Sequence, residues 1–260
     1  MSQKVSYHLN TGVGSVRIHS PETGNALDAA LLGDLHLALT TLTADPHCRV
    51  IVISAEGKAF CTGMDIEGVF GNGRKPNTDL FQRFLDCLIL ISNANQVVIA
   101  IVEGKTEGGG LGLAAACDIV LATHSATFML SEVILGLIPA LIAPFLLRRL
   151  SPGAVRYLAL SSRRVGVDEA QRMGLVDEVV EAMTDTALER QLGRLLRSSP
   201  AAIAQTKRYL QKLSNVDFGQ QQEMALEQAE SWLNEPDVIA GVQLFADGGL
   251  PFWFTRVKGS

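Results

Sequence analysis

The chain has 260 residues, of which 47% are hydrophobic and 19% charged, so it holds enough apolar surface for a large folded core. Its formal net charge of -5 argues against nucleic acid as the main partner. No apolar stretch is long enough to span a bilayer, no signal-peptide pattern opens the chain, and histidines and cysteines form no metal-ligand cluster. We therefore expect a cytoplasmic protein with reduced core thiols, no metal ion, and no membrane or nucleic-acid partner.

The first half of the chain alternates strand and helix patterns. In chain order the patterns predict a hairpin at 5–9 and 13–19, a helix from the N-cap Asp28 to about residue 42, a strand at 50–54, a glycine-rich loop at 55–73, a helix at 79–92 and a strand at 97–102. Strands that are separated by helices favour parallel pairing within an α/β core.

Three consecutive glycines, Gly108, Gly109 and Gly110, stand between the strand at 97–102 and a small-residue helix pattern at 111–117. A strand that enters a helix through residues without side chains leaves N–H groups of the helix N-terminus open to an approaching oxygen. Such a turn can hold a phosphate, or the oxyanion of an enolate or tetrahedral intermediate. It can equally be a tight turn that binds nothing.

The second half of the chain becomes increasingly helical. Strand patterns occur at 118–122 and 127–130, and after Pro144 the pattern is helical to the end apart from an interruption at 175–180. The Ala- and Gln-rich helices of the last third have no strand partners. We expect a core over residues 1–200 and a C-terminal helical region over 201–260 that acts as a lid or in oligomerisation.

Four segments occur in the order and spacing typical of one known family. They extend over roughly the whole chain and lie at 59–66 (AFCTGMDI), 104–119, 128–139 and 170–177. Together they resemble the crotonase (enoyl-CoA hydratase/isomerase) superfamily. The resemblance implies an α/β fold with a ββα superhelix and a C-terminal helical region, assembled as a homotrimer or a dimer of trimers. It also implies an oxyanion hole, formed by the backbone N–H groups of Met64 and Gly109, for the carbonyl oxygen of a thioester.

Hydratases of this superfamily carry two glutamates, of which this chain matches one. The first position is Gly112, and the second is Glu132. A carboxylate in the apolar surroundings of residue 132 is expensive to bury unpaired, so we expect proton transfer by Glu132 with a pKa raised by desolvation; a helix-end or ion-pair role is the alternative. Asp65 is either a second catalytic residue or a structural one that bonds to backbone amides. One carboxylate favours syn dehydration, double-bond migration or decarboxylation.

Within the superfamily, the segment at 128–150 and the aromatic tail at 248–253 resemble the β-branching dehydratases of polyketide assembly lines. The resemblance implies loss of water from a 3-hydroxy-3-methylglutaryl group on the phosphopantetheine of an acyl carrier protein, without a further cofactor. The tail can also simply anchor onto the protein's own surface. Three alternatives are a CoA-dependent hydratase or isomerase of branched-acid metabolism, the decarboxylase that acts next, and a binding module without catalysis.

Such a substrate carries a distal carboxylate, for which we expect a cation. The candidates are Lys105, Arg148 and Arg149, although each can also be a surface residue. Docking of an acidic carrier protein would need a local basic patch, and Arg74–Lys75 or Lys207–Arg208 could supply it.

Overall fold

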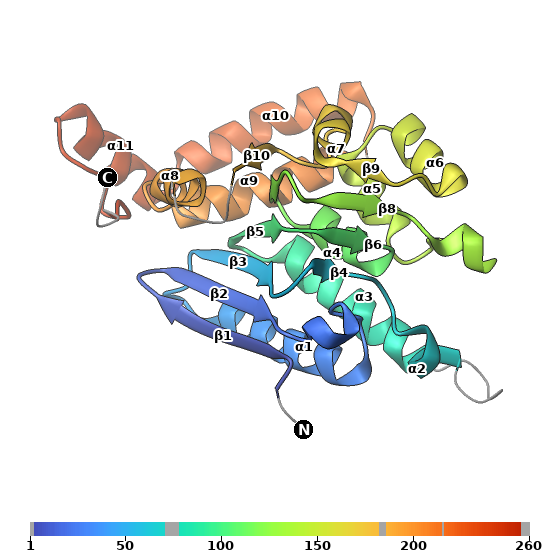
Figure 1. Cartoon of the computed structure of the whole chain (residues 1–260). Coiled ribbons are helices and arrows are strands. Elements are labelled where there is room, and N and C mark those ends of the chain that lie inside the picture. Colours follow the sequence, from blue (N-terminus) through green and yellow to red (C-terminus); the bar gives the residue numbers. More distant parts are fainter. Residues whose placement is uncertain (1–2, 71–77, 182–185, 215, 256–260) are drawn as a thin grey trace. The chain divides into compact units, whose positions relative to one another are not determined.

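The computed structural model describes residues 3–70, 78–181, 186–214 and 216–255 (Figure 1). By its internal contacts the chain divides into two compact units, Met1–Glu189 and Arg190–Ser260. The first is an α/β unit with two sheets, and the second is helical in its described part. No helix of the described ranges combines the length and the apolar character that a membrane span requires.

A six-stranded sheet forms the larger layer of the first unit. Its spatial order is β1 (Val5–Asn10), β2 (Val13–Ile18), β3 (Val50–Ala55), β5 (Val97–Val102), β7 (Ile119–Thr123) and β10 (Glu178–Val180). The predicted hairpin of β1 and β2 is confirmed, and it is the antiparallel pair. All other neighbours in this sheet pair in parallel, because a crossover through helices separates them.

A second sheet of four very short strands lies at one end of the first. Its order is β4 (Ala59–Cys61), β6 (Lys105–Glu107), β8 (Thr127–Met129) and β9 (Val165–Gly166). Two- and three-residue strands are too short to show a sequence period, so β4, β6 and β9 were not predicted. Their importance is that β4 leads into the loop around Met64 and β6 leads into the three glycines.

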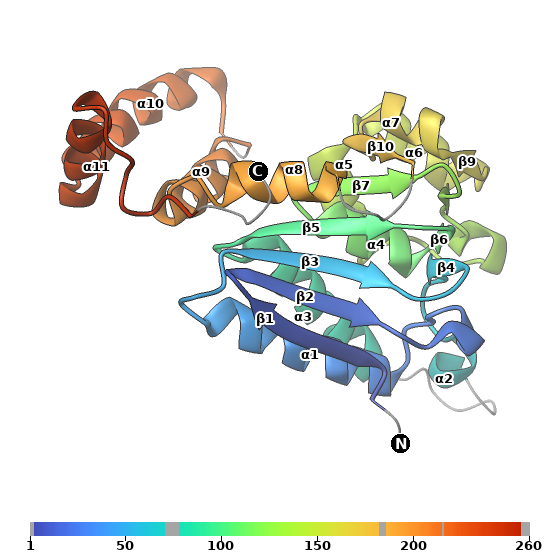
Figure 2. The same ribbon diagram turned by 60° about the vertical axis from the view of Figure 1, so that its left-hand side comes forward.

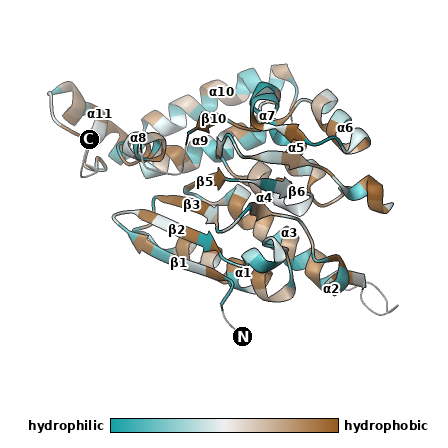
Figure 3. Cartoon of the chain, viewed as in Figure 1, coloured by the Kyte–Doolittle hydropathy of each residue, from teal (hydrophilic) through white to brown (hydrophobic). Residues whose placement is uncertain are grey.

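Helices α1 (Ala29–Ala44), α3 (Thr78–Asn93) and α4 (Gly109–Ala116) lie along one face of the large sheet (Figure 2). All six residues of β5 and all eight of α4 are buried, so both elements are apolar on every side (Figure 3). The remaining helices of the unit are η1 (Pro21–Thr23), α2 (Ile66–Phe70), η3 (Glu132–Leu135), α5 (Ala143–Arg149), α6 (Pro152–Ser161) and α7 (Val167–Met173).

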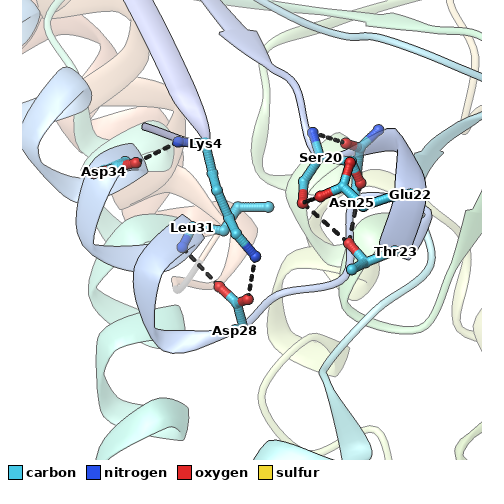
Figure 4. Close-up of polar contacts among 8 residues, drawn as sticks. All are labelled: Lys4, Ser20, Glu22, Thr23, Asn25, Asp28, Leu31 and Asp34. Atoms are coloured by element: carbon cyan, nitrogen blue, oxygen red, sulfur yellow. Dashed lines mark hydrogen bonds and ion pairs between the residues drawn. The ribbon is translucent and has the colours of Figure 1, made fainter. Parts of the chain in front are cut away.

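The N-terminus of α1 confirms the predicted cap. The Asp28 carboxylate accepts a hydrogen bond from Leu31 N at 2.8 Å, which satisfies one of the open N–H groups of the first turn. The same carboxylate pairs with Lys4 Nζ at 2.5 Å, while the Lys4 backbone N–H donates to Asp34 (Figure 4). These contacts connect the start of the chain to α1.

The C-terminal unit contains α9 (Pro200–Leu213), α10 (Phe218–Leu233) and α11 (Pro236–Ala246), and α8 (Thr186–Leu195) runs into it. Side-chain caps start two of these helices, Ser199 at α9 and Asp217 at α10. The aromatic tail packs within this unit: the Trp253 ring lies where a Cβ on Gly241 would stand, at 2.0 Å. A role of this region as a lid or in oligomerisation stays a prediction.

Helix α4 packs so closely on β4 that residue 110 must be glycine. A Cβ on Gly110 would lie 2.3 Å from the backbone oxygen of Cys61, which cannot move without disrupting β4. We expect Gly110→Ala to lower the free energy of unfolding by at least about 2 kcal/mol. The control is Gly33→Ala within α1, where no atom lies within 4 Å of the added methyl. That variant should gain up to about 1 kcal/mol from helix propensity, and equal urea midpoints for the two variants would contradict the prediction.

Candidate active site

A cavity of about 380 Å³ lies in the first unit, beside the C-terminal ends of β4 and β6. Four segments line it: the loop after β4 with α2, the buried side of α3, the glycine turn, and residues 131–142. Among the described lining residues Glu132 is the only charged one, and most of the others are apolar. An apolar cavity with a single ionisable group is the environment in which that group's proton affinity departs from its value in water.

The glycine turn presents bare backbone to this cavity. Gly108 has a φ of 48° and precedes α4 without a side-chain cap. Gly109 is the first residue of α4, and its N–H donates to no acceptor in the described part of the chain. A Cβ on Gly109 would lie 2.8 Å from Leu27 Cδ1, and one on Gly108 would lie 3.3 Å from Glu132 Oε1. A side chain at 109 would therefore overlap Leu27, and one at 108 would crowd Glu132 and require a backbone conformation that favours glycine.

The loop after β4 places a second N–H group beside the first. Gly63, with a φ of 94°, comes so close that its Cβ would stand 3.2 Å from Gly109 N. The next residue is Met64, which lies between two backbone bonds to Leu27: Leu27 N donates to Gly63 O at 2.8 Å, and Asp65 N donates to Leu27 O at 3.2 Å. Successive N–H groups of an extended chain point to opposite sides, so Met64 N–H faces away from Leu27.

Both predicted oxyanion donors thus line one cavity. Within the described ranges the Met64 N–H, like that of Gly109, donates to no protein acceptor. Two such N–H groups on adjacent segments are the arrangement that stabilises a negative carbonyl oxygen. Their role in catalysis remains a prediction, and the geometry is compatible with it.

Glu132, the first residue of η3, lines the same cavity. Its Oε2 is buried and has no hydrogen-bond partner in the described structure, and its Oε1 lies next to Gly108. Burial raises the pKa of this carboxyl, and the backbone N–H groups of Glu132 and Ser131 only partly oppose the rise. A carboxyl with a raised pKa is better able to accept and return a proton near neutral pH.

Two further positions bear on why the described lining carries one carboxylate. A Cβ on Gly112 would lie 2.3 Å from Ile142 Cγ2, so Ile142 occupies the space of any side chain at position 112. Asp65 does not line the cavity. It stands at the start of α2, where its Oδ2 would be 2.6 Å from a Cβ on Gly68 and its backbone oxygen accepts from Val69 N. The position of Asp65 fits the structural alternative.

The cations expected to meet a distal carboxylate are not at the cavity. Lys105 is exposed at the start of β6, in a separate hollow that Lys58 and Arg164 also line. Arg148 donates to Ser92 Oγ, in another small pocket.

Arg149 has a structural role instead. Its guanidinium donates to the backbone oxygens of Leu175 and Cys117 and pairs with Asp177, which connects the end of α5 to the segments that precede β10 and β7. Of the two basic pairs considered for carrier docking, Lys207–Arg208 lies on α9, and Arg74–Lys75 lies outside the described residues.

Several residues that shape the cavity were not identified from the sequence. Phe81 and Phe84 form a wall from α3, and Leu137 and Ile142 form a wall from the segment after Glu132. The available signal was the unusual apolar run at 133–138, in which Ile138 is 76% exposed and yet lines the cavity. Among the described residues no group of three His, Cys, Asp or Glu side chains could hold a metal ion.

Comparison with known proteins identifies the family. The profile described as Enoyl-CoA hydratase/isomerase matches residues 8–256. The chain belongs to the enoyl-CoA hydratase/isomerase family. It is 28% identical to the bacillaene synthase dehydratase PksH of Bacillus subtilis, over 96% of each chain, and 31% identical to the carnitinyl-CoA dehydratase of Citrobacter koseri, over 98% of this chain and all of the other. An enoyl-CoA hydratase structure from Shewanella pealeana superposes with a TM-score of 0.91, at 25% identity and 96% coverage of each chain.

These matches establish both fold and class of activity. The chain has the α/β crotonase fold with two sheets and C-terminal helices, as predicted. It is a lyase of the enoyl-CoA hydratase or dehydratase type, whose family acts on thioesters.

The buried position of Glu132 predicts that the stability difference between the wild type and a Glu132→Gln variant depends on pH. Because the pKa of Glu132 is raised in the fold, its contribution to stability is present while the carboxyl is protonated and is lost as the pH rises through that pKa. Gln cannot ionise. We therefore expect the melting temperature of Glu132→Gln to rise relative to that of the wild type as the pH increases from about 4, near the pKa of an unfolded Glu, toward neutrality. The exposed Glu223→Gln serves as the control, and a constant difference for Glu132→Gln across this range would show the prediction to be wrong.

Proposed function

We propose that the chain dehydrates a 3-hydroxyacyl thioester. The thioester carbonyl oxygen accepts hydrogen bonds from Met64 N–H and Gly109 N–H, and Glu132 is the single acid/base group. The observation that carries the proposal is the convergence, on one apolar cavity, of one half-buried carboxyl and two N–H groups that have no acceptor among the described residues.

The reaction balances with one carboxylate. Ionised Glu132 takes the α-proton, and the electrons of the C–H bond form an enolate whose oxygen is held by the two N–H groups. The enolate then re-forms the carbonyl and the α,β double bond while the bond from the β-carbon to its hydroxyl breaks. The departing hydroxyl takes the proton back from Glu132 and leaves as water, so the elimination is syn and the carboxylate is regenerated.

The acyl group we propose is 3-hydroxy-3-methylglutaryl on the phosphopantetheine of an acyl carrier protein, which gives 3-methylglutaconyl. The similarity to the bacillaene synthase dehydratase over almost the whole of both chains supports this substrate. So does the exclusion of a second carboxylate at Gly112, because a tertiary hydroxyl departs with less acid assistance than a secondary one. With this substrate we retain a cytoplasmic location and a homotrimer or dimer of trimers as expectations.

A second candidate is a hydratase or isomerase that acts on a CoA thioester with an uncharged acyl chain. It is favoured by one observation: the described cavity lining contains no Lys, Arg or His to pair with a distal carboxylate. Relatives named as CoA enzymes, such as the carnitinyl-CoA dehydratase, are also similar over the whole chain.

The deciding experiment is mass spectrometry of two substrates after incubation with the protein. We expect 3-hydroxy-3-methylglutaryl-loaded carrier protein to lose one water, and Glu132→Gln to slow that loss by roughly 10²- to 10⁴-fold. Faster water loss from 3-hydroxybutyryl-CoA would favour the second candidate. Release of carbon dioxide from the methylglutaconyl carrier would assign the decarboxylase role, and an unchanged rate for Glu132→Gln would refute the mechanism.

The role of Met64 can be tested separately, because a backbone donor depends little on its side chain. Met64→Ala keeps the N–H and should retain the dehydration rate within about threefold, whereas Met64→Pro removes it and should lower kcat by roughly 10²- to 10³-fold. Both variants are first compared with the wild type in thermal melts. Equal losses of kcat in the two folded variants would argue that the side chain, and not the N–H, is what matters.

A further inference from the structure

Asn25 is a polar residue with no exposed surface, outside the cavity lining. It has a φ of 58°, and its side chain connects three separate segments. Its Oδ1 accepts from Ser20 N at 2.8 Å (Figure 4), and its Nδ2 donates to Glu56 O at 2.9 Å and Ala59 O at 2.7 Å. The amide group of Asn25 thus forms hydrogen bonds with three places in the chain: the residues just after β2, the loop before β4 and the first residue of β4.

On both sides of Asn25, at Gly24 and Leu27, the backbone runs alongside the loop that carries Met64. Thr62 N donates to Gly24 O at 3.1 Å, and Leu27 then forms its two backbone bonds on either side of Met64. Because these bonds use Gly63 O and Asp65 N, they determine the side toward which Met64 N–H points.

Leu27 also contacts the residue that carries the other donor. Its Cδ1 lies 2.8 Å from the position of a Cβ on Gly109, and its side chain is completely buried. One residue therefore holds Met64 through its backbone and supports Gly109 through its side chain. Leu27 is thus common to both donor residues, and Asn25, two residues before it, is bonded to the first residue of β4.

We infer that residues 25–27 are the positioning element of the oxyanion hole, with Asn25 as its anchor. This inference rests on the proposed use of Met64 and Gly109 as donors. Neither Asn25 nor Leu27 touches the reacting atoms; both act through the two donor residues. Misplacement of such donors by a fraction of an ångström lowers the rate without preventing substrate binding.

The test replaces Asn25 by Asp, which has nearly the same shape. Asp keeps an acceptor for Ser20 N. It places an oxygen against the carbonyls of Glu56 and Ala59, which accept from Asn25 Nδ2 in the wild type. We expect kcat to fall by roughly ten- to hundredfold while KM changes less than about threefold. Infrared difference spectra supply the second readout: butyryl-pantetheine with a ¹³C carbonyl, which cannot lose water, should show a lowered carbonyl stretch on the wild type and a smaller shift on the variant.

A matched control is Gln96→Glu. Gln96 is another buried amide whose Nε2 donates to backbone oxygens, those of Leu42, Thr43 and Cys48, away from the cavity. We expect this variant to lose thermal stability and to keep both kcat and the carbonyl shift. If Asn25→Asp does not fold, the milder Leu27→Val, which withdraws the contact with Gly109, is expected to reduce the same two quantities.

The outcomes separate the inference from the proposed reaction. A folded Asn25→Asp with wild-type kcat and carbonyl shift overturns the inference, as does an equal loss in Gln96→Glu. A wild type that leaves the carbonyl stretch unshifted overturns it too. A further outcome is a carbonyl shift that is present in the wild type and lost in Asn25→Asp, together with no dehydration of either tested substrate by the wild type. It would support the positioning role and refute the proposed function.

Discussion

The close approach of two backbone segments, one at Gly63 and one at Gly109, is the constraint on which the rest of the site depends. A Cβ on Gly63 would stand 3.1 Å from Glu107 O and 3.2 Å from Gly109 N, so the close approach depends on Gly63, while a Cβ on Gly109 would meet Leu27 at 2.8 Å. The close approach brings together two N–H groups that have no acceptor in the described part of the protein. Helix α4 can begin at this point because Gly110 lets it press against β4. Close backbone contacts of glycine residues thus determine how β4, α4 and the cavity lie together.

The cavity around these groups sets their electrostatic strength. Its apolar lining excludes competing dipoles, so hydrogen bonds from the two N–H groups to a developing oxyanion are stronger than they would be in water. The same lining desolvates Glu132 and raises its pKa. One environment therefore favours both halves of the proposed chemistry, charge on the carbonyl oxygen and a proton held by the carboxyl. The described part of the lining offers no cation to a charged acyl terminus, which is why substrate identity and mechanism are separate questions.

Sequence reasoning predicted the features that local rules determine. The hairpin, the Asp28 cap, the apolar strand of β5 and the open turn at the glycines each follow from residues within about ten positions. The short strands β4, β6 and β9 did not, because pairing with distant partners creates them. Asn25 and Leu27 were missed for the same reason: their significance lies in contacts with residues more than 30 positions away. Lys105 and Arg148 were chosen for charge alone, and charge does not reveal which side of an element a residue occupies.

The contact between Gly112 and Ile142 shows how core packing can limit the reactions that a site is able to catalyse. A missing glutamate at 112 could by itself be read as a simple loss, with room left for water or for another group. Ile142 fills that room from a segment 30 residues later, at a distance that admits no side chain. Ile142 also lines the cavity, so the atoms that exclude a second carboxylate form part of the wall against which the acyl group would lie. A site with two acid/base groups would need both residues to change together. A single carboxylate in the described lining is therefore a property of the core as well as of the candidate site, and the proposed mechanism, which recycles one proton through Glu132, is compatible with this packing.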